Sequence, residues 1–196
     1  MSVYAGVVGP APTRIIVGYG FWIFLLSDII LFSALFATYA VLQGQTAGGP
    51  SAHQLFELRN AGIETVALLF SSYTCGLAIV AIERRRMRAF YVCFALTFIL
   101  GAVFLSLELN EFAGLIARGA GPARSGFLSA FFSLVGLHGA HVTIGLLWLI
   151  FLIAQTAYRG PVDYVCRRLL CFSLFWHALD IIWVALLTMV YLMGAR

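Results

Sequence analysis

Charged side chains are scarce in this sequence, and lysine is absent from it. Only 10% of the 196 residues are charged, whereas 62% are hydrophobic. A water-soluble domain of ordinary composition carries about 25% charged residues, so this composition excludes a surface that faces water on all sides. The outer surface of the folded chain is therefore predicted to face lipid.

Long apolar runs agree with this prediction, because a helix needs about 20 residues to cross the hydrocarbon core. The runs cover about 15–42, 61–82, 89–112, 127–157 and 165–193. The first run is too long for a cleaved secretory signal and carries Asp28 near its middle. We expect an all-α integral membrane protein, with five transmembrane helices that form a single membrane domain over residues 1–196.

The basic residues are all arginines, and their distribution predicts the topology. With five spans, one side of the membrane receives Arg14, Arg84, Arg85, Arg86, Arg88, Arg159, Arg167 and Arg168. The other side receives Arg59, Arg118, Arg124 and Arg196. The positive-inside rule then predicts a cytoplasmic N-terminus and a periplasmic C-terminus. Topology is sufficient to explain the cluster Arg84–Arg88, which could also bind anionic lipid.

The four cysteines give no sign of a disulfide framework or a metal site. They are Cys75, Cys93, Cys166 and Cys171, and no C-x-x-C motif occurs among them. All four fall toward the predicted cytoplasmic side, where thiols stay reduced. We expect them to be packing residues.

A stripe of small residues follows the fourth span. Ser129, Ser133, Gly136, Ala140 and Thr143 recur at spacings of four and three, which places them on one side of a helix. Small residues let a neighbouring helix approach closely in a membrane. Because His138 and His141 lie on roughly the opposite side, this helix is predicted to be central and contacted by protein on two faces.

Ionisable side chains inside the spans are the candidate functional residues, because they are costly to insert into a membrane. The cost for an Asp is about 2.5–3.5 kcal/mol. Asp28, His138, His141, His177 and Asp180 are expected near the midplane. Glu64, Glu108 and Glu111 are expected closer to the periplasmic surface, within reach of Arg59 and Arg124. Such groups usually face a partner or a cavity.

Three interpretations of these groups remain open on chemical grounds. His177 and either His138 or His141 could bind a haem between two spans, as in a membrane cytochrome b. Asp28 and Asp180 could serve a proton-coupled transporter, although the sequence lacks the inverted repeats and broken helices common in that class. The groups could instead form a structural hydrogen-bonded network, because buried polar atoms need partners.

Several motifs in order resemble subunit III of the haem–copper terminal oxidases. They are Arg124-Ser-Gly-Phe-Leu-Ser-Ala-Phe-Phe, His138-Gly-Ala-His141-Val, Trp176-His177-Ala-Leu-Asp180-Ile-Ile-Trp183 and Glu108-x-x-Glu111. Ser27-Asp28-Ile-Ile-Leu-Phe resembles the segment with the family's carbodiimide-reactive carboxylate, which is usually Glu. The resemblance extends from about residue 18 to 194. The segment that begins at Glu64 and the ending Val190-Tyr-Leu-Met-Gly are most similar to bo-type ubiquinol oxidases.

The resemblance implies a short form of the family that lacks the first two helices of mitochondrial-type members. It implies a non-catalytic subunit of a proton-pumping ubiquinol oxidase, in the bacterial inner membrane, that stabilises subunit I and supports proton uptake. Haems and copper would belong to subunit I and none to this chain. Subunits I, II and IV and phospholipids would be its partners, with no nucleic acid. A cytochrome c oxidase subunit III and an accessory subunit of nitric oxide reductase are alternatives.

Overall fold

Regular structure in the chain is helical. The computed structural model describes residues 13–48 and 58–193. Its elements are α1 (Thr13–Leu42), α3 (Leu58–Glu83), α4 (Met87–Ala117), α5 (Gly126–Arg159), α6 (Asp163–Leu186) and a π-helix, η1 (Leu187–Leu192), that continues α6. Within the described ranges, five helical spans are long and apolar enough to cross a membrane. The predicted all-α bundle of five transmembrane helices is therefore confirmed.

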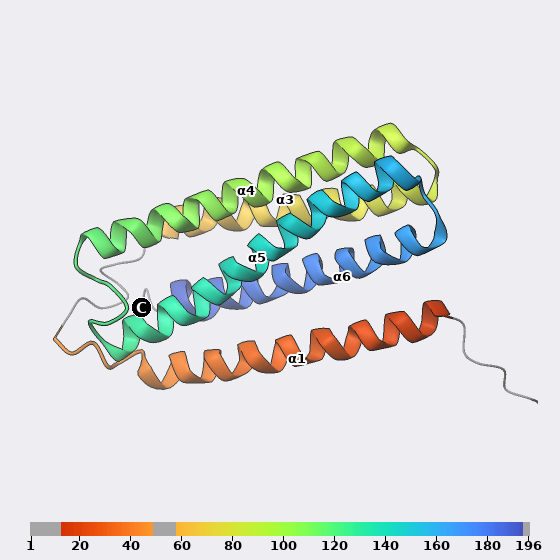
Figure 1. Cartoon of the computed structure of the whole chain (residues 1–196). Helices are drawn as coiled ribbons and strands as arrows, with labels where there is room; N and C mark the ends of the chain where they lie inside the picture. The colour runs from red at the N-terminus through yellow and green to blue at the C-terminus, as the bar shows by residue number, and fades with distance from the viewer. Residues whose placement is uncertain (1–12, 49–57, 194–196) are drawn as a thin grey trace, which may run out of the picture.

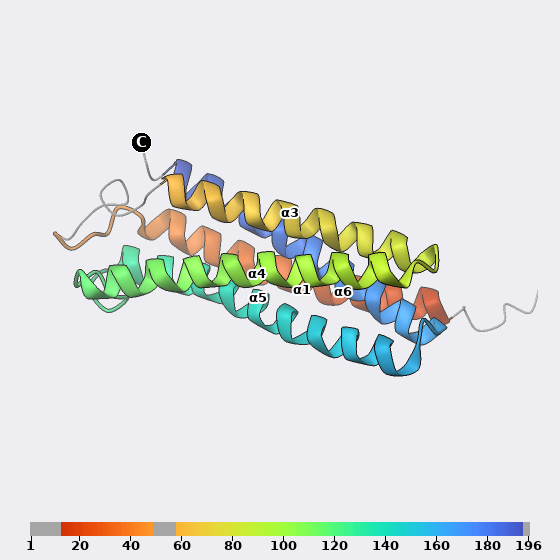
Figure 2. The ribbon, with the colours of Figure 1, turned by 90° about the horizontal axis from the view of Figure 1, so that it is seen from above.

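The helices form a bundle in which α1 lies at the edge (Figure 1). α3 and α4 run side by side in opposite directions, α5 and α6 pack against them, and α1 packs mainly on α5 and α6. In the view from above, α3 lies beside α4, and α1 passes behind α4 on the far side of the bundle (Figure 2). In the most apolar stretch of α1, 11% of the residues are buried. In the corresponding stretch of the span that ends in η1, 56% of the residues are buried. Specific contacts to α5 and α6 must therefore hold α1 in place.

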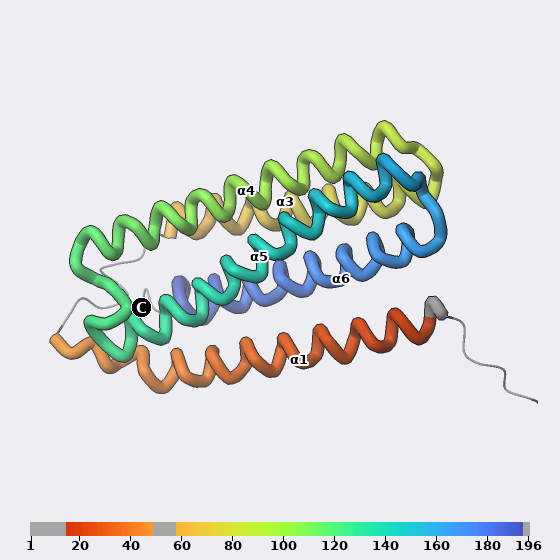
Figure 3. Tube along the Cα trace, viewed as in Figure 1, coloured from red at the N-terminus to blue at the C-terminus, as the bar shows by residue number. Residues whose placement is uncertain are grey.

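Short turns keep consecutive helices antiparallel, as the chain trace shows (Figure 3). Three arginines, Arg84–Arg86, connect α3 to α4, and Arg85 takes a left-handed φ of 55°. Gly160, with a φ of 73°, ends α5 at the turn into α6. At the start of α5 the Ser125 hydroxyl accepts a hydrogen bond from the Leu128 amide at 3.2 Å, which caps the helix.

The arginines divide between the two ends of the bundle. The turns α3–α4 and α5–α6 lie at the same end as the start of α1 (Figure 1), and this end carries Arg84, Arg85, Arg86, Arg88, Arg159, Arg167 and Arg168. The opposite end carries Arg59, Arg118 and Arg124. The side chain of Arg14 and all of Arg196 lie outside the described residues. The assignment of the first end to the cytoplasm stays a prediction.

The small-residue stripe of α5 is largely exposed. Ser129, Ser133, Ala140 and Thr143 are exposed, and Gly136 is half-buried. A Cβ atom added to Gly136 would lie 3.6 Å from Phe112 Cε2 of α4. α5 turns the side with His138 toward the interior, since that side carries the larger apolar residues. The four cysteines are free thiols.

The closest approach between helices occurs where the Trp176 side chain of α6 meets two glycines. A Cβ atom added to Gly145 of α5 would lie 2.8 Å from Trp176 Cζ3, and one added to Gly101 of α4 would lie 3.0 Å from the same ring. No larger residue fits these positions without displacing the indole. Trp176 is thus packed between α4 and α5.

Replacement of Gly145 by Ala tests this packing. We expect Gly145→Ala to lower the free energy of unfolding by about 1–3 kcal/mol through overpacking. The matched control is Gly139→Ala in the same helix, where the added Cβ would meet Leu105 Cδ1 at an ordinary 3.9 Å. Equal thermal stability of the two purified variants in detergent would contradict the packing described.

Candidate functional site

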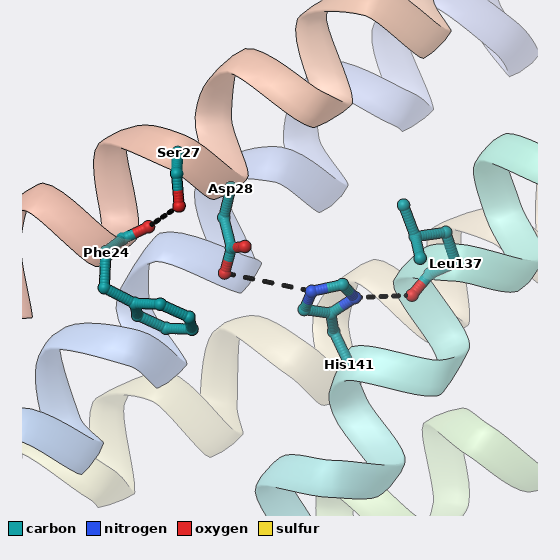
Figure 4. A network of polar contacts seen from close by, with 5 residues as sticks. All are labelled: Phe24, Ser27, Asp28, Leu137 and His141. Carbon is teal, nitrogen blue, oxygen red and sulfur yellow. Dashed lines mark hydrogen bonds and ion pairs between the residues drawn. The ribbon is translucent and has the colours of Figure 1, made fainter.

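Asp28 and His141 form a contact between α1 and α5 (Figure 4). His141 Nε2 lies 3.8 Å from Asp28 Oδ2, and the two side chains are 15% and 16% exposed. The other ring nitrogen, Nδ1, lies 2.8 Å from the backbone oxygen of Leu137. Asp28 has no arginine within two turns of its own helix, so its partner comes from another span.

This contact attaches α1 to the bundle. The Leu137 carbonyl can only accept, so His141 Nδ1 carries the hydrogen and donates it. Nε2 is then the ring nitrogen that faces Asp28 Oδ2, within ion-pair distance.

His138 lies one turn away in an aromatic enclosure. Its ring centroid is 5.2 Å from that of Trp183, 5.6 Å from that of Phe104 and 6.4 Å from that of Phe32. The side chain is fully buried, and neither ring nitrogen has a hydrogen-bond partner among the described residues. His138 thus stays outside the expected network of hydrogen bonds.

A series of polar contacts, here termed the polar ladder, joins α3 to α6. The Trp183 indole donates to Thr65 Oγ1 and the Trp176 indole donates to Ser71 Oγ, both at 3.0 Å. Ser72 Oγ lies 2.6 Å from His177 Nδ1, and the Cys75 thiol hydrogen-bonds Ser173. From the first contact to the last, the advance from Thr65 to Cys75 along α3 is matched by an equal retreat from Trp183 to Ser173 along α6, as antiparallel packing requires. The ladder thus fixes the register of the two helices.

His177 and Asp180 meet the same hydroxyl of α3. Ser72 hydrogen-bonds the Asp180 carboxyl as well as His177. The second carboxyl oxygen, Oδ1, has no hydrogen-bond partner among the described residues. The predicted pairing of these two residues with neighbouring protein is therefore made through Ser72, which sequence reasoning did not single out for this role.

Three glutamates gather at the end of the bundle opposite the arginine-rich turns. Glu64 and Glu108 are 1% and 3% exposed, and Glu111 accepts from the Tyr191 hydroxyl at 3.3 Å. Their carboxyl groups are close enough to repel one another. A cavity of about 230 Å³ beside them is lined by Glu64, Glu111, Asn60 and Arg118, among others.

The arginines expected beside these glutamates are not their partners in the described structure. Arg59 is exposed, and Arg124 donates to the Gly119 backbone oxygen at 3.2 Å. Arg118 lines the glutamate cavity instead. It follows the glutamate pair on the same helix, two turns after Glu111, whereas Arg124 lies beyond the turn that ends this helix.

Two tryptophans are the functional residues that sequence reasoning missed. Trp176 and Trp183 were not among the candidate residues, yet their indole nitrogens donate to hydroxyls of α3. A usable signal existed, because the two tryptophans are seven residues apart and Thr65 and Ser71 are spaced almost equally. Seven residues correspond to two helical turns.

Several of these contacts join neighbouring helices. Within residues 13–48 and 58–193, no group of three or more His, Cys, Asp or Glu side chains is placed to hold a metal ion. His177 contacts α3 through Nδ1, whereas the Nδ1 contact of His141 lies within its own helix. The site is therefore best described as a set of cross-helix polar contacts at several depths.

Comparison with known proteins gives one consistent result. Residues 8–195 match the family model described as cytochrome c oxidase subunit III. The chain is 51% identical to the cytochrome bo(3) ubiquinol oxidase subunit 3 of Pseudomonas aeruginosa over 177 residues, which cover 90% of this chain and 85% of the relative.

Two further bacterial proteins are similar at lower identity. The cytochrome bo(3) ubiquinol oxidase subunit 3 of Buchnera aphidicola subsp. Baizongia pistaciae is 44% identical, covering 89% of this chain and 90% of the relative. The quinol oxidase subunit 3 of Bacillus subtilis is 43% identical, covering 89% of this chain and 86% of the relative.

A double-mutant cycle tests the contact between α1 and α5. We expect the double variant Asp28→Leu/His141→Leu to lose less free energy of unfolding than the sum of the losses in the two single variants. The expected difference is about 0.6–1.7 kcal/mol, from the average to the largest value for interhelical hydrogen bonds in membranes. The readout is the free energy of unfolding in detergent. Asp28→Leu combined with Trp183→Phe, which alters a different contact, is the control and should be additive. Additivity of the first pair would show that Asp28 and His141 do not interact.

Proposed function

This chain belongs to the cytochrome c oxidase subunit III family, and on that premise we propose that it is the non-catalytic subunit III of a proton-pumping ubiquinol oxidase. The observation that carries the proposal is the 51% identity, over 90% of the chain, to a subunit named for ubiquinol oxidation. Five apolar helices and bacterial relatives make the chain a multi-pass protein of the bacterial inner membrane.

The geometry supports an accessory role within an oxidoreductase complex. Asp28, His141, His177 and Asp180 contact side chains of neighbouring helices, which is how buried polar groups hold a membrane bundle together. Catalysis, haems and copper are accordingly assigned to subunit I. Ubiquinol is the proposed electron donor because the relatives from Pseudomonas and Buchnera carry it in their names.

Direct contact with subunit I is proposed at the exposed small-residue stripe of α5. Ser129, Ser133, Ala140 and Thr143 are exposed in the described part of the chain, and small residues allow a helix of another subunit to approach closely. The chain is proposed to form one membrane domain with its N-terminus in the cytoplasm. Subunits II and IV complete the proposed assembly.

Phospholipids are proposed as further partners. An apolar groove of about 460 Å³ lies between α1 and α6, lined on one side by Trp22, Ile29 and Phe36. The groove can accommodate an acyl chain. Arg84, Arg85, Arg86 and Arg88 are all exposed at the proposed cytoplasmic surface, where arginines attract anionic headgroups.

Purification of the intact complex tests the function. An affinity-tagged chain in mild detergent is expected to copurify with a haem–copper subunit and to support oxygen consumption with ubiquinol but not with cytochrome c. The chain separated from the complex should show no Soret band. A Soret band that the separated chain retains, and that His177→Ala removes, would support a cytochrome b and contradict the proposal. Activity with cytochrome c in place of ubiquinol would identify a cytochrome c oxidase.

A further inference from the structure

The outward face between α3 and α6 carries polar groups at the middle of the membrane. Ser72 lies near the centre of α3, and His177 lies near the centre of the span formed by α6 and η1. A surface cavity of about 490 Å³ at this position is lined by Ser72, Tyr73, Gly76, Leu77, His177 and Asp180, among others. We refer to these six residues as the mid-depth patch.

Two polar atoms of the patch have no hydrogen-bond partner within the described part of the chain. Ser72 Oγ lies 2.6 Å from His177 Nδ1, so the hydrogen bond to α3 occupies one nitrogen of the ring. The other nitrogen, Nε2, faces Gly76. Among the described residues, no hydrogen bond reaches His177 Nε2 or the buried Asp180 Oδ1.

The exposed residues of the patch also indicate contact with protein. Tyr73 is 64% exposed on the outer surface, although tyrosines that face lipid are typically found at the membrane interface. Gly76 leaves open space beside His177, since a Cβ added there would meet only His177 Nε2, at 3.9 Å. The patch is therefore a shallow recess with a polar floor.

Lipid cannot provide hydrogen bonds to the polar atoms of this recess. Acyl chains offer no hydrogen bonds, and polar side chains at this depth usually face the protein interior or a cavity. A second copy of the chain is also a poor occupant, because a twofold contact brings the same patch onto itself. Such a contact would place like polar groups of the two copies beside each other.

We infer that the mid-depth patch binds a transmembrane helix of another oxidase subunit, which supplies a hydrogen-bond partner to His177 or Asp180. This inference rests on the proposed function, because it requires partner subunits. The patch lies between α3 and α6, whereas the small-residue stripe lies on α5. The two faces thus give the chain two separate contacts with the rest of the assembly.

Photo-crosslinking in native membranes tests the inference. A benzophenone amino acid is placed at Tyr73, and at Ile99 in the middle of α4 as a control of similar exposure, 55%. We expect the probe at Tyr73 to give a covalent adduct with another oxidase subunit, identified by mass, and the probe at Ile99 to react with lipid. Reaction of the Tyr73 probe with lipid alone, or with a second copy of this chain, would overturn the inference.

A space-filling variant gives an independent test. Gly76→Leu occupies the recess and leaves the polar groups in place, whereas Gly20→Leu adds the same bulk to open space on α1. We expect Gly76→Leu to reduce the crosslinked subunit retained in mild detergent by about threefold, the effect of losing an average interhelical hydrogen bond. The Gly20→Leu variant should retain the crosslinked subunit fully. Equal retention in the two variants would contradict the inference.

The two proposals fail in different ways. A tagged chain that retains no oxidase subunit at all would contradict the proposed function. A tagged chain that retains the haem–copper subunit, while the Tyr73 probe labels only lipid, would contradict the mid-depth patch alone.

Discussion

The absence of water from the hydrocarbon core is the constraint on which this structure depends. A polar atom at that depth must find its partner within the protein, because lipid offers none. The polar ladder meets this requirement between α3 and α6, where hydroxyls of one helix accept from the indoles of the other. Between α1 and α5, the side chains of Asp28 and His141 contact each other. Among the described residues the requirement is unmet at several buried groups, including His138 and Asp180. Asp180 lines a surface cavity, and this position is the basis for the proposed partner outside the chain.

The spans could be predicted from the sequence, whereas the contacts between them could not. A helix needs a long apolar run to cross the membrane, and such runs are visible in a single sequence. The partner of Asp28 lies in a different span and depends on how α1 is rotated against α5. The indoles of Trp176 and Trp183 count as apolar in any hydrophobicity pattern, so their donor groups escaped notice.

The sequence also did not show which side of α5 packs toward the interior of the bundle. Small residues on one side and histidines on the other both indicate protein contact, and only the fold shows which contact belongs to this chain. The histidine side packs inward, because large apolar residues accompany it and fill the core. The small-residue side is the proposed contact with another subunit. A chain that buries little of α1 and leaves polar groups at its surface is suited to function within an assembly.

Removal of the hydroxyls that join α3 to α6 is the most direct test of this account. The variant Thr65→Val/Ser71→Ala/Ser72→Ala should lose about 2 kcal/mol of unfolding free energy, three times the ~0.6 kcal/mol average for an interhelical hydrogen bond. Its control is Ser27→Ala/Ser33→Ala/Thr38→Val in α1, whose hydroxyls bond only to backbone oxygens of their own helix. The account predicts a clear loss for the first variant and almost none for the second. Equal stability of the two in detergent unfolding would contradict it.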